Sequence, residues 1–196
     1  MSAHESLEHA EHAEHAAGAN KKIALLIAVI ALFLALAETL GKGAQTESIS
    51  LNVEASNLWA FFQAKSIRST TLQAAAEGLQ AQSDAAADPG AKAALAKPIE
   101  AWRQTVARYE DEPDTGEGRK QLSGRAKEAE LKRDLAMAKY HHFEIASAAF
   151  QIAIVLASAT IITGMLALAW VSGALAMSGI IFVAIGLFAP LSVHLV

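Results

Sequence analysis

The chain has 196 residues, of which 53% are hydrophobic and 18% charged, with a formal net charge of −4. This balance offers no concentrated basic surface that would release counterions from phosphates, so nucleic acid is excluded as a partner. The chain has no cysteine, which excludes disulfide bonds, thiolate nucleophiles and cysteine-bound zinc.

The charges are sharply segregated along the chain. Every Asp, Glu, Lys and Arg lies within residues 1–22 or 38–144, and none follows Glu144. So long an uncharged stretch cannot be the surface of a soluble protein. We therefore expect an all-α integral membrane protein with three transmembrane helices and a helical, coiled-coil domain inserted between the first and second spans.

Residues 1–22 form a polar tail rich in His and Glu. His9, His12 and His15 recur every three residues, which on a helix brings neighbours near one face and within reach of one metal ion. Imidazole suits Zn, Cu or Ni. The preferred alternative is a solvated amphipathic or disordered tail, because no enclosing core is apparent. No cofactor is expected.

The first transmembrane helix is predicted over residues 23–41. Ile23 to Ala37 is unbroken apolar sequence that ends at Glu38, and Thr39 to Gly41 extend it towards the ~20 residues that a bilayer requires. The Ala35-Leu36-Ala37 pattern also resembles a signal-peptide cleavage site. We favour the membrane anchor, because the preceding tail is long and acidic rather than short and basic.

Residues 42–144 are predicted to form a soluble helical domain, which Pro and Gly divide into three stretches. The first covers Thr46 to Ala87, the second runs from about Ala91 or Pro98 to Glu110, and the third continues from near Arg119 into the second span. Spacings of four and three predict seams that require partner helices. These seams are Leu51, Ala55, Leu58, Phe62, Lys65, Ser69, Leu72, Ala76 and Leu79 in the first stretch, and Leu95, Ile99, Trp102, Val106 and Tyr109 in the second.

Two interpretations of these seams stay open. The three stretches could cover one another as a short antiparallel bundle. Alternatively, the seams could join several subunits in a coiled coil. Lys65 and Ser69 interrupt the first seam with polar side chains under either interpretation.

The second and third transmembrane helices are predicted over residues 145–170 and 174–195, joined by a tight turn at Val171-Ser172-Gly173. Small residues recur in all three spans at spacings of three and four, which favours close helix packing and a homo-oligomer. These stripes are Ala24, Ala28, Ala31 and Ala35 in the first span; Ala146, Ala149, Ala153, Ala157, Thr160, Gly164 and Ala167 in the second; and Gly179 and Gly186 in the third.

A boundary cluster of polar residues is predicted where the first span ends and the second begins. Glu38 continues the small-residue stripe of the first span, and His141, His142 and Glu144 precede the second. Because the two spans cross in opposite directions, we expect Glu38 to lie close to the other three. Such groups could bind a metal or sense pH, or could simply anchor the helix ends at the interface.

Orientation follows the count of Lys and Arg near the span ends. Six flank the middle domain, against two in the N-terminal tail: Lys42, Arg125, Lys127, Lys132, Arg133 and Lys139, against Lys21 and Lys22. We therefore expect a multi-pass protein of the bacterial inner membrane with its middle domain in the cytoplasm.

Several strings resemble one known family. They are EHAEHA, KKIALLIAVIALFLALAETLGKGAQTE, NVEASNLWAFFQAKSIRSTT, AWRQTVARYE, DTGEGRK and HHFEIASAAFQIAIVLASATIITG. Together they resemble the bacterial membrane proteins grouped as the domain of unknown function 4337 family, over nearly the whole chain. The resemblance implies an inner-membrane protein with this arrangement of spans. It implies no activity and transfers no functional residues.

No catalytic motif accompanies these features. GxSxG and HExxH are absent, and GKGAQTE lacks the spacing of a phosphate-binding loop, so no enzymatic activity is expected. We expect a scaffold or accessory protein that is anchored in the lipid bilayer and self-associates. The alternative is a small oligomeric channel or transport accessory, although beyond Gln151 the last two spans offer no ionisable relay. A weaker alternative is a metal- or pH-responsive sensor.

Overall fold

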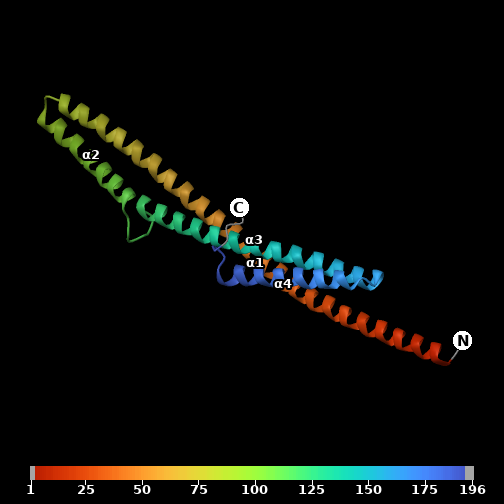
Figure 1. Cartoon of the computed structure of the whole chain (residues 1–196). Helices are drawn as coiled ribbons and strands as arrows, with labels where there is room; N and C mark the ends of the chain where they lie inside the picture. The colour runs from red at the N-terminus through yellow and green to blue at the C-terminus, as the bar shows by residue number, and fades with distance from the viewer. Residues whose placement is uncertain (1–2, 193–196) are drawn as a thin grey trace. The chain divides into compact units, whose positions relative to one another are not determined.

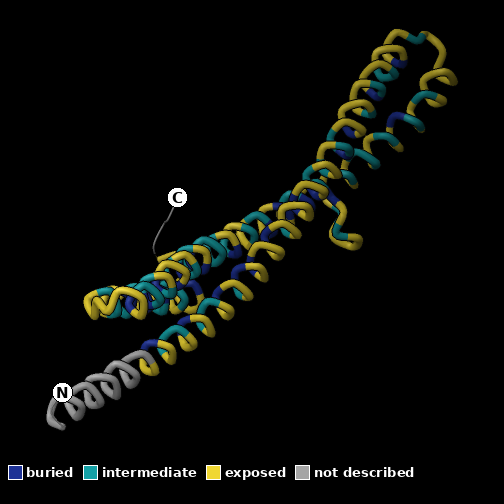
Figure 2. The backbone as a smooth tube through the Cα atoms, turned by 90° about the vertical axis from the view of Figure 1, so that its right-hand side faces the viewer, coloured by how far each residue is buried: buried dark blue, intermediate teal, exposed yellow. Residues whose placement is uncertain are grey.

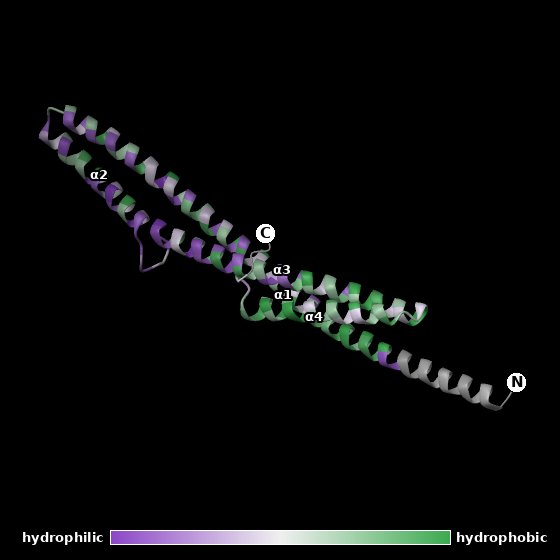
Figure 3. Ribbon diagram, in the orientation of Figure 1, coloured by the Kyte–Doolittle hydropathy of each residue, from purple (hydrophilic) through white to green (hydrophobic). Residues whose placement is uncertain are grey.

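A computed structural model describes the backbone of residues 3–192 and the side chains of residues 21–192. Its elements are the helices α1 (Ala3–Ala85), α2 (Pro89–Glu110), α3 (Arg119–Thr163) and α4 (Leu166–Phe188) (Figure 1). Helices α1, α3 and α4 each contain a stretch long and apolar enough to cross a membrane, and these stretches stand out in green in Figure 3. The all-helical prediction with three candidate spans is thereby confirmed.

The chain divides into two compact units, which we describe separately. The apolar unit contains residues 1–48 and 134–196, and the polar unit contains residues 49–133. Helices α1 and α3 each contribute to both units. The predicted continuation of the third polar stretch into the second span agrees with the single helix Arg119–Thr163.

In the polar unit, the predicted seams face inward. Buried positions recur along one side of α1 and α2 (Figure 2), and every seam residue of both stretches is buried or half-buried. Leu58 of α1 packs with Leu122 and Ala126 of α3, while Trp59 and Phe62 lie against this cluster. The chain's own helices therefore cover the seams, as the antiparallel-bundle interpretation requires.

The connection between α1 and α2 uses local hydrogen bonding. Helix α1 ends at Ala85, and Asp88 caps α2 by accepting a hydrogen bond from the Ala91 amide at 2.8 Å. Pro89 is the first residue of α2, where its missing N–H costs no helix hydrogen bond. The Asp88-Pro89 pair thus ends one stretch and begins the next.

The loop of residues 111–118 joins α2 to α3. The side-chain amide of Gln121 makes two hydrogen bonds to the start of this loop. Its Nε2 donates to Asp111, and its Oε1 accepts from the Glu112 backbone N–H at 3.3 Å. Gly116 adopts a φ of 68°, which favours glycine. A side chain at Gly118 would collide with Gln121 and with the Glu112 backbone.

In the apolar unit, one aromatic ring organises the contact of the three spans. Phe150 of α3 is fully buried and stacks on Phe33 of α1, with ring centroids 6.1 Å apart. On its other side, a Cβ at Gly179 of α4 would lie 2.7 Å from the Phe150 ring. The absence of a side chain at Gly179 therefore makes room for Phe150, as the prediction of a small-residue contact in the third span anticipated.

The turn between the second and third spans lies earlier than the sequence predicts. Helix α3 ends at Thr163, Gly164 takes a φ of 70°, and α4 begins at Leu166. Val171-Ser172-Gly173 lies inside α4, so the predicted bounds 145–170 and 174–195 are wrong at the turn. The buried Ser172 hydroxyl donates to the Ala153 carbonyl at 2.7 Å, so this small polar residue is a packing contact between helices.

Within the chain, the small-residue stripe of the first span does not make the predicted contact with the second span. Ala24, Ala28, Ala31 and Ala35 are exposed, and the inward face instead carries Ile23, Ile30, Ala37 and Ala44. Lipid and protein interior are both apolar, so small size alone does not select the buried face; here the fit around Phe150 does. The second-span stripe is buried or half-buried from Ala146 to Thr160, whereas Gly164 lies in the turn and Ala167 in α4.

Candidate functional site: a boundary groove between α1 and α3

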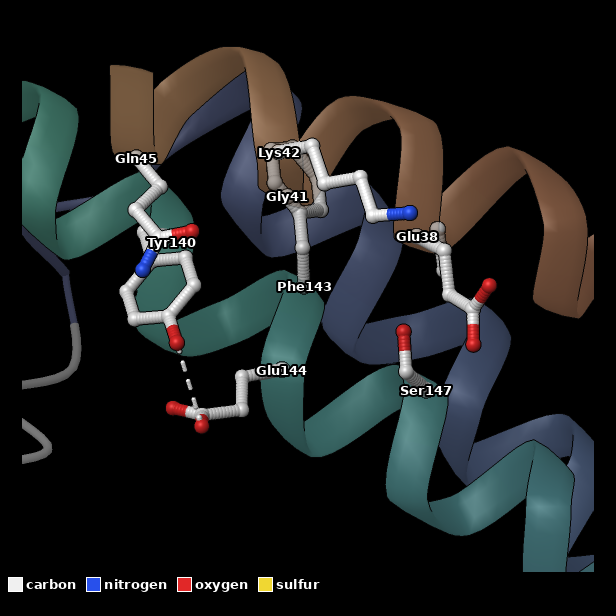
Figure 4. Close-up of a pocket in the computed structure, with 9 residues that line it drawn as sticks. Glu38, Gly41, Lys42, Gln45, Tyr140, Phe143, Glu144 and Ser147 are labelled. Carbon is white, nitrogen blue, oxygen red and sulfur yellow. Dashed lines mark hydrogen bonds between the residues drawn. The ribbon is translucent and has the colours of Figure 1, made fainter. Parts of the chain in front are cut away.

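A groove of about 280 Å³ lies between α1 and α3 within the apolar unit. It contains two carboxylates, one ammonium, and several neutral polar side chains over an apolar base (Figure 4). Its lining residues are Ala37, Glu38, Gly41, Lys42, Gln45, Tyr140, Phe143, Glu144 and Ser147. We call this site the boundary groove.

The α1 wall of the boundary groove places polar groups on successive turns. Glu38 and Lys42 are four residues apart, so they share one face of the helix, and Figure 4 shows both side chains on the groove side. Glu38 accepts a hydrogen bond from the Gln151 amide of α3 at 3.4 Å. Beneath them, a Cβ at Gly41 would lie 3.5 Å from the Phe143 Cβ, so the two helices touch at the base.

The α3 wall is organised around Glu144. The Tyr140 hydroxyl donates to the Glu144 Oε1 at 3.2 Å, and the His141 Nδ1 lies 3.7 Å from the Oε2. The negative charge of Glu144 raises the pKa of the Tyr140 phenol, and desolvation and the hydrogen bond act in the same direction. The groove thus combines two carboxylates with one lysine, a set that can attract a cationic or zwitterionic group.

His142 lies away from the boundary groove. It is fully buried, its ring stacks on Phe182 of α4, and its Nε2 lies 3.1 Å from the Pro190 carbonyl oxygen. A carbonyl oxygen only accepts, so the Nε2 donates, and the Nδ1 then has no hydrogen-bond partner among the described residues. His142 therefore holds the chain just beyond α4, a contact that sequence reasoning missed.

The structure thus divides the predicted boundary cluster. Glu38 and Glu144 line the boundary groove, His141 lies beside Glu144, and His142 contacts α4. Over residues 21–192, no three His, Asp or Glu side chains come together to hold a metal ion. His9, His12 and His15 lie outside the residues whose side chains are described.

A second polar site, in the polar unit, was not predicted. The Lys65 ammonium, with its side chain 5% exposed, lies 2.9 Å from the Glu112 Oε2. It also lies over the rings of Phe61 and Tyr109, 5.3 and 5.5 Å from their centroids. Cations are attracted to aromatic faces, so the rings favour the buried charge. In the sequence, the only indication of this site was a lysine at a seam position together with an acidic loop.

These features define a membrane-associated, all-helical protein in which small-residue packing joins the apolar helices and ion pairs hold a separate polar unit. The chain belongs to the family described as domain of unknown function (DUF4337), which matches residues 19–189. The resemblance seen in the sequence is thereby confirmed. No match was found among curated proteins or among solved structures.

Proposed function

We propose that this protein is a membrane-anchored helical scaffold or accessory protein that self-associates and has no enzymatic activity. The observation that carries the proposal is that apolar and polar helices are segregated into two units. One unit contains all three membrane-length apolar stretches, and the other contains ion-paired polar helices with a core of their own.

Packing in the apolar unit supports an anchoring role. Ala146, Ala153 and Ala157 of α3 are completely buried, and the Ser172 hydroxyl is satisfied by a backbone carbonyl. In lipid, helices associate through close backbone approach and hydrogen bonds of this kind. An anchor built this way holds its three helices together without needing a ligand at its centre.

The polar unit supports a role in presenting helical surfaces. Its seams are filled by side chains of the same chain, so the outward faces of α1 and α2 can meet other proteins. The excess of Lys and Arg near the two ends of the domain of residues 42–144 supports a cytoplasmic position at the bacterial inner membrane. Partners of the scaffold would then be cytoplasmic or membrane proteins.

Affinity purification from membranes in a mild detergent tests the proposal. We expect a mass of more than one chain together with specific co-purifying proteins. A protein that is monomeric in several mild detergents and also purifies alone would overturn the scaffold role.

A small oligomeric channel or transport accessory is the second candidate, favoured by one observation. Glu38 and Gln151 are exposed polar side chains on α1 and α3 that hydrogen-bond to each other, and an oligomer could bring them to a common axis. Neighbouring exposed positions on the same helices, such as Leu32, Leu36 and Ile152, are apolar, which favours lipid contact. Conductance of reconstituted protein that is abolished by Glu38→Ala would favour the channel.

A further inference from the structure

Helix α1 has a second regular face within the polar unit, opposite its buried seam. We call it the outer face. Its members follow one another at spacings of three and four and are all exposed: Ile49, Val53, Ser56, Ala60, Gln63, Ile67, Thr71, Ala74, Gly78, Ala81 and Ala85. None of them is charged, although this stretch of helix carries Glu54, Lys65, Arg68, Glu77 and Asp84 at other positions.

The large apolar members of the outer face are mostly exposed to solvent. Ile49 is 59% exposed, Val53 54% and Ile67 68%. Lipid does not account for this exposure, because the polar unit carries charged residues that a bilayer interior would exclude. Three bulky β-branched side chains among small residues on an uncharged helix face allow a second helix to approach closely.

Thr71, near the centre of the outer face, can be buried without losing its hydrogen bond. The Thr71 hydroxyl already donates to the Ile67 carbonyl at 2.9 Å, and the neighbouring Thr70 hydroxyl donates to the Ser66 carbonyl at 3.0 Å. Burial of a satisfied hydroxyl avoids the cost of an unpaired donor. A shallow depression of about 540 Å³, which includes Ile67, Thr71 and Ala74, could receive a side chain of a partner helix.

We propose that the outer face is the dimer interface, occupied by the outer face of a second copy of this chain with its α1 running in the same direction. This inference deepens the proposed function, because it rests on self-association and names the surface responsible. Two copies inserted in one membrane share one orientation, which selects the parallel arrangement. A face without charges meets its own copy without like-charge repulsion, and a two-fold axis pairs each residue with its counterpart.

The size of the outer face is sufficient for a specific contact. From Ile49 to Ala85 it extends for about 55 Å at ~1.5 Å per residue, and a helix is about 10 Å wide. A contact of these dimensions covers about 550 Å² on each copy, or about 1,100 Å² in total, which exceeds the roughly 1,000 Å² expected of a biological interface. Insertion in one membrane further raises the local concentration of the two copies.

Cysteine cross-linking tests the arrangement directly, because the chain has no native cysteine. Ala60→Cys places a thiol on the outer face, where the parallel dimer brings it opposite its own copy. Ala101→Cys is the matched control, an exposed alanine on α2. With mild oxidation of native membranes, we expect disulfide-linked dimers of A60C and none above background for A101C. Equal cross-linking of the two variants, or of A60C to a different protein, would overturn the proposal.

Charge introduction separates this inference from the proposed function. The double variant Val53→Glu with Ile67→Glu places four carboxylates in the dimer contact and should reduce the mass in mild detergent to that of one chain. Leu131→Glu, at a 72% exposed position of α3, should leave the dimer intact. Circular dichroism verifies that the variants stay helical. A native protein that is monomeric overturns self-association altogether, whereas a native oligomer that survives V53E/I67E overturns only the outer face.

Discussion

The ammonium of Lys65 and the carboxylate of Glu112 lie 2.9 Å apart, although 47 positions separate them in the chain. Lys65 occupies a buried seam position of α1, and Glu112 lies in the loop that follows α2. A buried ammonium is stable only with a partner, so the pair ties the loop of residues 111–118 to the middle of α1.

Removal of one member of this pair should destabilise the polar unit. Lys65→Met keeps most of the aliphatic stem but leaves the Glu112 carboxylate without its nearest cation, so we expect a lower melting temperature by circular dichroism. Because the remaining charge is the source of the loss, Lys65→Met with Glu112→Met should recover most of it. A double variant as unstable as the single one would show that the ion pair itself is needed.

Acid should weaken the same contact. The hydrogen bond from Lys65, followed by its charge and that of Arg108, lowers the pKa of Glu112 from its ordinary value of 4.5. A lowered pKa means that the stabilisation is fully present above this ordinary value and is lost as the pH falls below it. We therefore expect the melting temperature to decrease when the pH is lowered beyond about 4.5. This decrease should be smaller in Glu112→Gln than in the exposed control Glu100→Gln. The same dependence of melting temperature on acid pH in both variants would contradict this.

Gly179 should tolerate no side chain while Phe150 is present. Its Cβ would lie 2.7 Å from the buried Phe150 ring, whereas a Cβ at Gly173 of the same helix would meet nothing within 4 Å. Gly179→Ala should therefore cost about 1–3 kcal/mol in unfolding free energy by overpacking. Gly173→Ala is the control, and denaturation in mixed detergent micelles measures both. If Phe150→Leu does not restore part of the loss, the ring is not the cause.

Loss of the His142 hydrogen bond should loosen the end of α4. His142→Phe keeps an aromatic ring of similar size but no longer donates to the Pro190 carbonyl, a loss of about 1 kcal/mol. Hydrogen exchange at the Ala189 amide, which donates to Ile185 at 2.8 Å, should then accelerate about fivefold if this end opens as a unit. His141→Phe should leave this exchange rate unchanged; equal acceleration in both variants would contradict the assignment.

The orientation proposal is tested by cysteine labelling. Thr115→Cys lies in the exposed loop of the polar unit, and Met165→Cys lies in the turn between α3 and α4. In intact spheroplasts, an impermeant reagent should label M165C and leave T115C unmodified until the membrane is permeabilised. The opposite pattern would place the polar unit outside the cytoplasm.

The polar unit was largely predictable from its sequence, because water makes the contrast between seam and surface visible. Spacings of four and three identified the inward face of α1 from Leu51 to Leu79, and the Asp88-Pro89 signal located the break before α2. The partner of Lys65 was not predictable, because no local pattern connects a seam lysine with a loop so distant in the chain.

In the apolar unit, hydropathy identified the candidate spans but not which face of each is buried. Lipid and protein interior exclude charge equally, so an alanine stripe in an apolar run carries little information about contacts. The Ala24 to Ala35 stripe is therefore exposed, and Ser172, within the segment where a turn was expected, is instead a contact between helices. At the boundary, the antiparallel order of the spans predicted proximity of Glu38 to the start of the second span, but not that His142 would face α4.

The glycines of α4 separate two properties that a hydropathy profile cannot distinguish: entry into the bilayer and assembly within it. A helix of leucines would enter at least as readily as α4. It would nevertheless fail to associate, because side chains at Gly179 and Gly186 would intrude on Phe150 and Phe143. Replacement of α4 by a generic hydrophobic anchor should thus yield a protein that is fully inserted but has lost its native helix packing.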